Sequence, residues 1–70
     1  MAASSSLKLR AYHHIRGKLV SGELRPGMAL SAGTLAREIQ ISTTPVREAI
    51  SHLESQGVVE TLPRLGPVVR

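Results

Sequence analysis

The residues best suited to chemistry in this sequence stand at the start of a predicted helix, in the stretch ISTTPVREAI at positions 41–50. Pro45 falls within the first turn, where its missing N–H has no intrahelical partner to lose. The hydroxyls of Thr43 and Thr44 can hydrogen-bond a phosphate or a base edge, and the guanidinium of Arg47 can pair with guanine through two hydrogen bonds. The helix N-terminus adds unpaired N–H groups and a partial positive charge. The stretch therefore predicts contact with nucleic acid.

No arrangement of residues in the sequence predicts an enzyme or a metal site. The histidines His13, His14 and His52 lack metal-site spacing, because the first two are adjacent and would diverge on a helix. The acidic side chains show no paired-carboxylate spacing, no Ser/His/Asp grouping is evident, and the chain has no cysteine. We therefore expect no catalysis, and no cofactor or metal in this domain.

The composition describes one small basic domain. Seventy residues with nine Lys and Arg against five acidic residues give a net charge of +4. Such a balance favours a polyanionic partner, although it also fits a merely soluble surface. With one tyrosine and no Phe or Trp, the core must be aliphatic and thin, which indicates a dimer or a larger parent protein. No apolar run of about 18 residues could span a membrane, and residues 1–6 have the composition of a flexible tail without a signal peptide, so we expect the cytoplasm.

Hydrophobic periodicity predicts three helices in the remainder of the chain. They are expected over residues 7–21, from an N-cap at Ser31 to about Ile39, and from an N-cap at Ser42 to about Gln56. Their apolar faces are Leu9, Tyr12, Ile15, Leu19 and Val20 in the first, Leu35, Ala36 and Ile39 in the second, and Val46, Ala49, Ile50 and Leu53 in the third. The opposite face of the third helix then directs outward Thr43, Thr44, Arg47 and Ser51.

Short connections and β-branched pairs define the rest of the expected fold. The second and third helices are separated by about three residues, which predicts a helix-turn-helix, with Gln40 at a turn position where glycine is common because φ is often positive there. Residues 24–30 contain a Pro-Gly turn and predict a brief strand. The valine pairs at 58–59 and 68–69, on either side of PRLG, predict a hairpin with its tip near residues 63–66.

These motifs together resemble the N-terminal winged-helix domain of GntR-type bacterial transcription regulators. The resemblance rests on the Pro-Gly turn, Leu35-Ala36, TPVREA, a Leu-Glu-x-x-Gly stretch and a glycine-tipped wing, and it covers about residues 10–70. TPVREA with PRLG is most similar to the subgroup whose C-terminal half is the helical FCD ligand-binding domain. The resemblance implies a mostly α fold with a small β-hairpin, a winged helix-turn-helix of three helices plus a wing over residues 7–70.

The resemblance also implies a function and a set of contacts. In the family, the third helix reads the major groove, the wing tip enters the minor groove, and homodimers bind near-palindromic operators, as repressors among other roles. The resemblance implies a small-molecule effector, with or without a metal, for a C-terminal domain that lies beyond this chain. The DNA contacts carried over or proposed from position fall on Arg37, Thr43, Thr44, Arg47, Ser51, Arg64, Leu65 and Gly66. Thr43 replaces a usual arginine and Leu65 a usual polar or basic residue, so the operator preference is expected to differ from the common pattern.

Several alternatives remain open on the sequence. Arg47 could pair with Glu48 or Glu54, Thr43 and Thr44 could only cap the helix, and Arg64 could be a solvated charge. A winged helix can also contact a protein partner or RNA in place of DNA. The lack of aromatic residues other than one tyrosine counts against single-stranded nucleic acid.

Overall fold

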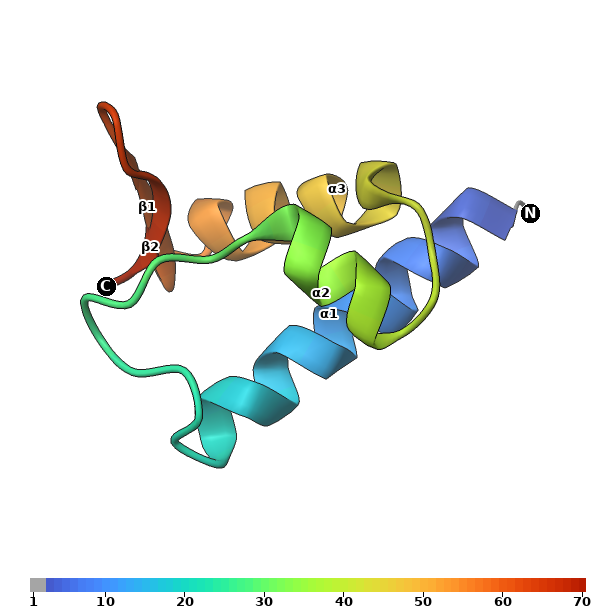
Figure 1. Ribbon diagram of the computed structural model, residues 1–70, viewed down its shortest axis with the longest axis horizontal. Coiled ribbons are helices and arrows are strands. Elements are labelled where there is room, and N and C mark those ends of the chain that lie inside the picture. Colours follow the sequence, from blue (N-terminus) through green and yellow to red (C-terminus); the bar gives the residue numbers. More distant parts are fainter. Residues whose placement is uncertain (1–2) are drawn as a thin grey trace.

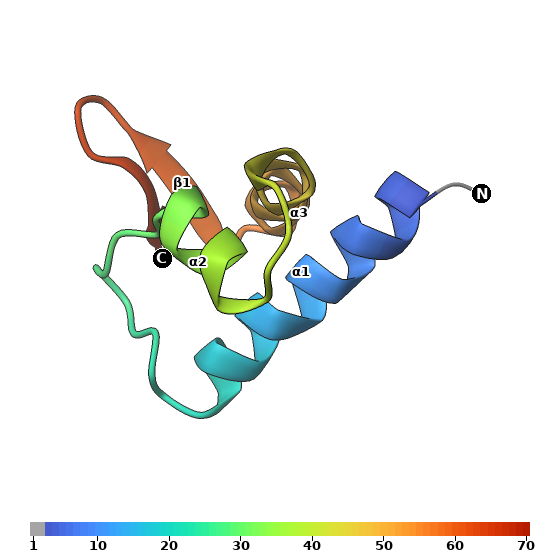
Figure 2. The ribbon, with the colours of Figure 1, turned by 45° about the vertical axis from the view of Figure 1, so that its right-hand side comes forward.

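A computed structural model of the protein describes residues 3–70, with side chains from Ser6 onward. Three helices are followed by one antiparallel hairpin, and the bounds are α1 Ala3–Val20, α2 Ala32–Glu38, α3 Thr43–Ser55, β1 Val59–Leu62 and β2 Gly66–Val69. The helices cross one another, and the hairpin projects away from them beside the C-terminal end of α3 (Figures 1 and 2). The predicted fold class, three helices plus a wing, is confirmed.

Helix α1 begins earlier than the sequence predicted. It starts at Ala3, four residues before the expected start at Leu7, so the prediction of a flexible tail is wrong for residues 3–6; residues 1–2 lie outside the described part. Once packed turns have nucleated a helix, each further residue adds one hydrogen bond for the dihedral angles that it fixes. The helix therefore extends to Ala3, beyond the expected start at Leu7.

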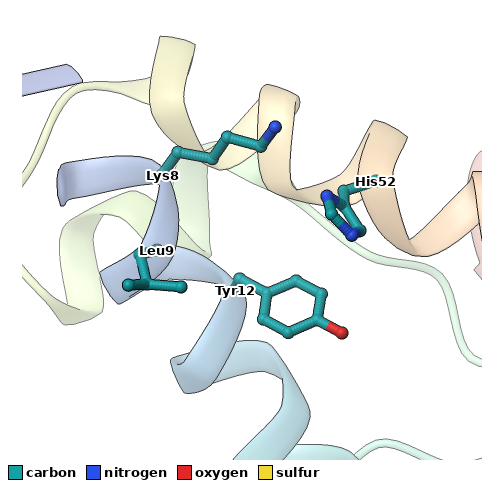
Figure 3. A pocket seen from close by; sticks show the side chains of 4 residues that line it. All are labelled: Lys8, Leu9, Tyr12 and His52. Carbon is teal, nitrogen blue, oxygen red and sulfur yellow. The ribbon is translucent and has the colours of Figure 1, made fainter. Parts of the chain in front are cut away.

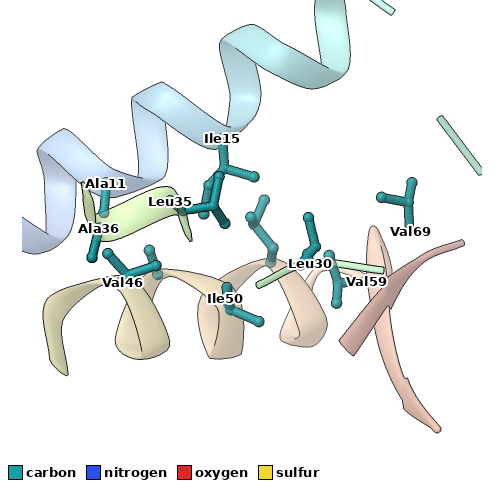
Figure 4. Packing of buried hydrophobic residues seen from close by; sticks show 11 residues of the cluster. Ala11, Ile15, Leu30, Leu35, Ala36, Val46, Ile50, Val59 and Val69 are labelled. Atoms are coloured by element: carbon teal, nitrogen blue, oxygen red, sulfur yellow. The ribbon is translucent and has the colours of Figure 1, made fainter. Parts of the chain in front are cut away.

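The core is an aliphatic cluster between α3 and the elements on either side of it (Figure 4). The prediction for α3 is confirmed, because all four of its expected core residues are buried. The buried apolar residues are Ala11, Ile15, Leu30, Leu35, Ala36, Val46, Ala49, Ile50, Leu53, Val59, Val68 and Val69. Each large aliphatic side chain removed from water in this way stabilises the fold by about 1.5–3 kcal/mol before entropy is counted.

The apolar face predicted for α1 is wrong at two positions. Leu9 is 55% exposed and Val20 is 80% exposed. Eleven residues make about three turns of a helix, so these two share one side of α1, which is turned away from the buried Ala11–Ile15 stripe. The sequence showed apolar residues at helical spacing on both sides and did not reveal the buried alanine.

The helix-turn-helix forms with the caps that the sequence predicted. The Ser31 hydroxyl accepts a hydrogen bond from the Thr34 N–H at 3.2 Å, which caps α2. Gln40 has a φ of 60°, so a non-glycine residue does occupy the left-handed turn position. Ser42 is the N-cap of α3 as expected, although its side chain makes no capping hydrogen bond, and Pro45 lies buried in the first turn.

The wing is a three-part arrangement built on β2. Strand β1 pairs antiparallel with β2 in a register that places Val59 opposite Val69 and Leu62 opposite Gly66. The strand expected within residues 24–30 is reduced to one bridge, Ala29 with Val68. Backbone hydrogen bonds between residues 27–30 and β2 continue from there, at 2.8–2.9 Å. The prediction of a strand is therefore correct in place but not in extent.

A shared carboxylate ties α1 to the end of α2. Glu38 Oε1 accepts from Lys18 Nζ and from His14 Nε2, each at 2.7 Å, and Lys18 also lies 3.2 Å from Glu23 Oε2. The hydrogen bond to Glu38 raises the pKa of Lys18, with burial acting against it, and the bonds from Lys18 and His14 lower the pKa of Glu38. Nearby, Arg10 donates to the Ile39 carbonyl at 3.4 Å. Three basic residues one turn apart on α1 thus hold the end of α2 that leads into the turn.

We expect Glu38→Gln to lower the free energy of unfolding by about 0.5–1 kcal/mol near neutral pH, the size measured for partly exposed ion pairs. Because the folded pKa of Glu38 lies below its ordinary value of 4.5, the unfolded chain binds this proton more tightly. The stabilisation is present above that value and is lost as the pH falls through the folded pKa. Urea unfolding over a series of pH values measures the free energy of unfolding of the unsubstituted chain and of Glu38→Gln. Glu48→Gln removes an exposed carboxylate as the control, and identical pH profiles for the two variants would contradict the role of Glu38.

A second expectation concerns the turn. Gln40→Gly should raise the free energy of unfolding by about 0.5–1 kcal/mol. The left-handed conformation costs an L-residue about 1–2 kcal/mol, which glycine avoids, and the greater flexibility of glycine in the unfolded chain offsets part of that gain. Thermal unfolding compares it with Gln40→Ala, which keeps the Cβ and should show no gain. A less stable glycine variant would show that the glutamine side chain contributes more than the strain that it imposes.

Candidate nucleic-acid interface

The outer face of α3 carries the predicted polar set. Thr44, Arg47 and Ser51 are exposed and Thr43 is half-buried, while the core residues of the same helix occupy its other side. Among the described side chains, no ion pair involves Arg47. The arginine is thus not bound to Glu48 or Glu54, as one alternative required, and its guanidinium donors are available to a ligand.

The wing tip is a tight turn at residues 63–65. Pro63 is followed by Arg64 with a φ of 73°, the sequence of conformations found in a type II turn, and Gly66 has a φ of 76°. Arg64 is exposed and Leu65 is 64% exposed. A Cβ added to Gly66 would meet no atom within 4 Å, so the backbone conformation, and not crowding within the chain, accounts for glycine there.

Arg37 lies at the C-terminal end of α2. It is exposed in the last turn of α2, and its carbonyl accepts from the Gln40 N–H at 3.2 Å. It does not line the space between α3 and the wing. Of the candidates, the structure brings only Arg47 and Ser51 into the cleft beside the wing, and Arg37 lies at the entrance to the turn.

A cleft of about 290 Å³ separates the outer face of α3 from the wing. Its polar walls are Arg47, Ser51 and Glu54 from α3 and Thr61 from β1. Its apolar lining is Leu30, Ala32, Ile50 and Pro67. The sequence did not predict Thr61 or Glu54 at this place. Glu54 could have been found from its spacing, because it follows Arg47 by seven residues, or two helical turns, whereas Thr61 is brought there only by the folding of β1 against the helices.

A second hollow of about 330 Å³ lies on the other flank of α3, toward α1. Lys8, Leu9, Tyr12 and His52 line it (Figure 3). The Tyr12 hydroxyl donates to Gln56 Oε1 at 3.0 Å, and its ring lies 5.0 Å from that of His52 in an edge-on arrangement. Seen nearly along α3, α1 lies on one side of that helix, and α2 and the wing lie on the other (Figure 2). Tyr12 therefore joins two helices away from the predicted interface.

The remaining candidates for chemistry give no further site in the described part of the chain. No group of three or more His, Cys, Asp and Glu residues there could hold a metal ion. His14, which the sequence excluded only from a metal site, is a partner of Glu38. Within residues 3–70, no helix combines the length and apolarity that crossing a membrane requires.

Comparison with known proteins now decides the family. The family model described as "Bacterial regulatory proteins, gntR family" matches residues 7–69. The chain belongs to the GntR family. It is a helix-turn-helix DNA-binding domain of the kind found in transcription regulators, and it is not an enzyme.

Individual relatives agree with this assignment. The gluconate operon transcriptional repressor of Bacillus subtilis (strain 168) is 37% identical over 67 residues, which are 96% of this chain and 27% of the relative. A GntR family transcriptional regulator from Pseudomonas syringae pv. tomato str. DC3000 superposes with a TM-score of 0.80 at 29% identity, over 99% of this chain and 30% of that one. A third relative is a solved structure described as "Lar controls the expression of the Listeria monocytogenes agr system and mediates virulence". It superposes with a TM-score of 0.85 at 35% identity, over 90% of this chain and 29% of that one.

The GntR chain thus spans between a quarter and a third of the length of these relatives. The predicted winged helix-turn-helix of a GntR-type regulator is confirmed. The FCD subgroup, the individual contact residues and the effector are not tested by these matches and stay predictions.

Proposed function

We propose that this GntR domain binds a near-palindromic operator in double-stranded DNA, with α3 in the major groove and the wing in the adjacent minor groove. The observation that carries this arrangement most directly is the outer face of α3, where an exposed arginine, with no ion-pair partner among the described side chains, follows two threonines at the helix N-terminus. The N-terminal residues of a recognition helix are the ones that meet base edges in the major groove. The basic net charge of +4 supports a polyanionic partner.

Each residue on α3 has a role that follows from its chemistry. Arg47 pairs with guanine O6 and N7 through two parallel hydrogen bonds. Thr44 and Ser51 hydrogen-bond a base or a phosphate, and their small size lets the helix approach closely. Thr43, which is half-buried where the family usually has arginine, supplies a hydroxyl in place of a charge. The operator that this domain prefers therefore differs at the base pair that the missing arginine would read.

The wing and α2 position the domain on the backbone. Arg64 supplies positive charge to the narrow minor groove, and the positive φ of Gly66 lets the chain enter β2 directly after the tight turn at the tip. Leu65, exposed and apolar, contacts the groove wall by packing. Arg37 contacts a phosphate from the end of α2. Such contacts fix register and orientation and carry little sequence information directly.

We further infer the role of the longer protein from its relatives. The matched Bacillus protein is named a transcriptional repressor, which supports a repressor in the cytoplasm. Homodimerisation would place two such domains on the two half-sites of the operator, because the symmetry of a dimer matches that of a palindrome. A small-molecule effector, with or without a metal, would act through a further domain of the FCD type.

Salt dependence tests the proposed function. The association constant for a duplex should fall as salt rises, with a log–log slope of about −0.9 for each phosphate neutralised. Fluorescence anisotropy titrations of a labelled duplex at several salt concentrations give this slope, and single-stranded DNA and structured RNA serve as competitors. Binding that is insensitive to salt would favour contact with a protein, and stronger competition by RNA would favour an RNA-binding winged helix.

The sharpest expectation for a single residue concerns Arg47. Arg47→Ala should weaken binding to the preferred operator by about 1–3 kcal/mol, the value of a good two-hydrogen-bond pair with a base. The loss on random DNA should be smaller, because only a general charge is removed. Arg25→Ala, in the exposed loop between α1 and α2, removes the same charge elsewhere and is the matched control.

The measurement is a pair of binding curves for each protein, on an operator selected from a random pool and on a random duplex. Circular dichroism confirms that the variants are folded, as expected for an exposed arginine. Equal losses on both duplexes for Arg47→Ala would reassign Arg47 to a phosphate, and no loss on either would remove it from the interface.

A further inference from the structure

Glu54 is a carboxylate on the face of the domain that carries the predicted DNA contacts. It lines the cleft between α3 and the wing together with Arg47, Ser51 and Thr61. Its spacing from Arg47, two helical turns, keeps it on the same side of α3. The other acidic residue of this helix, Glu48, does not line the cleft. The two glutamates thus share charge and exposure and differ in position.

Nothing in the described part of the fold needs a negative charge at this place. Glu54 is exposed, and no ion pair among the described side chains involves it. It stands near the C-terminal end of α3, where the partial negative charge of the helix disfavours a carboxylate. Structural stability therefore gives no reason for glutamate at position 54.

The proposed docking brings DNA phosphates to this carboxylate. If α3 lies in the major groove and the wing in the neighbouring minor groove, the one sugar–phosphate strand that separates the two grooves must cross the mouth of the cleft. The cleft offers that strand the cationic Arg47, the neutral hydroxyls of Ser51 and Thr61, and the anionic Glu54. Phosphates beside Ser51 or Thr61 gain hydrogen bonds, whereas a phosphate beside Glu54 is repelled.

We propose that Glu54 is a specificity-determining residue that acts by repulsion. Resting on the docking proposed above, it limits the positions that the backbone strand can take in the cleft and so disfavours registers in which Arg47 does not meet its base. On the operator, the contacts of α3 hold the strand in the register that avoids the carboxylate. On random DNA no such register is preferred, and the strand encounters Glu54 more often. A charge placed against the wrong complex raises specificity without adding affinity for the right one.

The test compares Glu54→Gln, Glu54→Asp and Glu48→Gln with the unsubstituted chain, on a selected operator and on a random duplex of the same length. Glu54→Gln should tighten binding to the random duplex by about three- to tenfold at low salt, and should change operator binding by less than about twofold. The ratio of operator affinity to random-duplex affinity therefore falls in this variant. Raising the salt should shrink the effect, because a Debye length of about 8 Å at physiological ionic strength screens an exposed charge.

The two other variants separate position from charge. Glu54→Asp keeps the carboxylate and should retain the discrimination of the unsubstituted chain. Glu48→Gln removes one negative charge outside the cleft and should raise both affinities equally. Thermal unfolding should show that Glu54→Gln is at least as stable as the unsubstituted chain.

Equal effects of Glu54→Gln and Glu48→Gln on the affinity ratio would overturn the proposal, and so would a loss of operator binding in Glu54→Gln, which would indicate an attractive contact with a base. If the unsubstituted chain binds neither duplex, the docking itself fails, a result distinguishable from failure of the role given to Glu54.

Discussion

The fold depends on one packing constraint, the burial of a single face of α3. Val46, Ala49 and Leu53 have no exposed surface, and their helix packs against α1, α2 and β1. Side chains project on all sides of a helix. When aliphatic side chains enclose this face of α3, the opposite face is therefore left exposed to solvent. The orientation of Thr44, Arg47 and Ser51 is thus a consequence of core packing.

Polar contacts gather around α2 because apolar packing alone cannot hold so short a helix in place. A helix of seven residues is too short to be stable alone in water, and its buried residues Leu35 and Ala36 supply little area. The Ser31 cap, the left-handed Gln40 and the Glu38 contacts with α1 define its two ends and its position. The helix-turn-helix angle therefore depends on hydrogen bonds and one unfavourable backbone conformation as well as on apolar packing.

The two flanks of α3 differ in chemistry and in purpose. Toward α1 the flank carries a hollow bridged by Tyr12, which bonds Gln56 and packs beside His52. Toward the wing it carries a cleft with Arg47 at one position and Glu54 at another. A domain of net charge +4 attracts DNA of any sequence. A carboxylate in the cleft repels the backbone at one place only, so it is suited to selecting among DNA sequences.

Much of this molecule was determined by the sequence alone. The periodicity of Val46, Ala49, Ile50 and Leu53 predicted the buried face of α3, and the caps at Ser31 and Ser42 predicted where α2 and α3 begin, because these signals are local and repeat within one or two turns. Likewise, the valine pairs around PRLG predicted the hairpin and its tip. The turn at Gln40 was identifiable from its position between two helices.

Only the tertiary structure decided which apolar residues of α1 are core. Leu9 and Val20 satisfy helical spacing as well as Ile15 does, and the choice depends on where α3 crosses α1, a contact between segments some 30 or more residues apart. The extent of the third wing segment and the sharing of Glu38 by His14 and Lys18 are likewise products of long-range contact. Local patterns specify how a segment coils and which side of it is apolar, but pairs of side chains from different segments meet only when the whole chain has closed around its core.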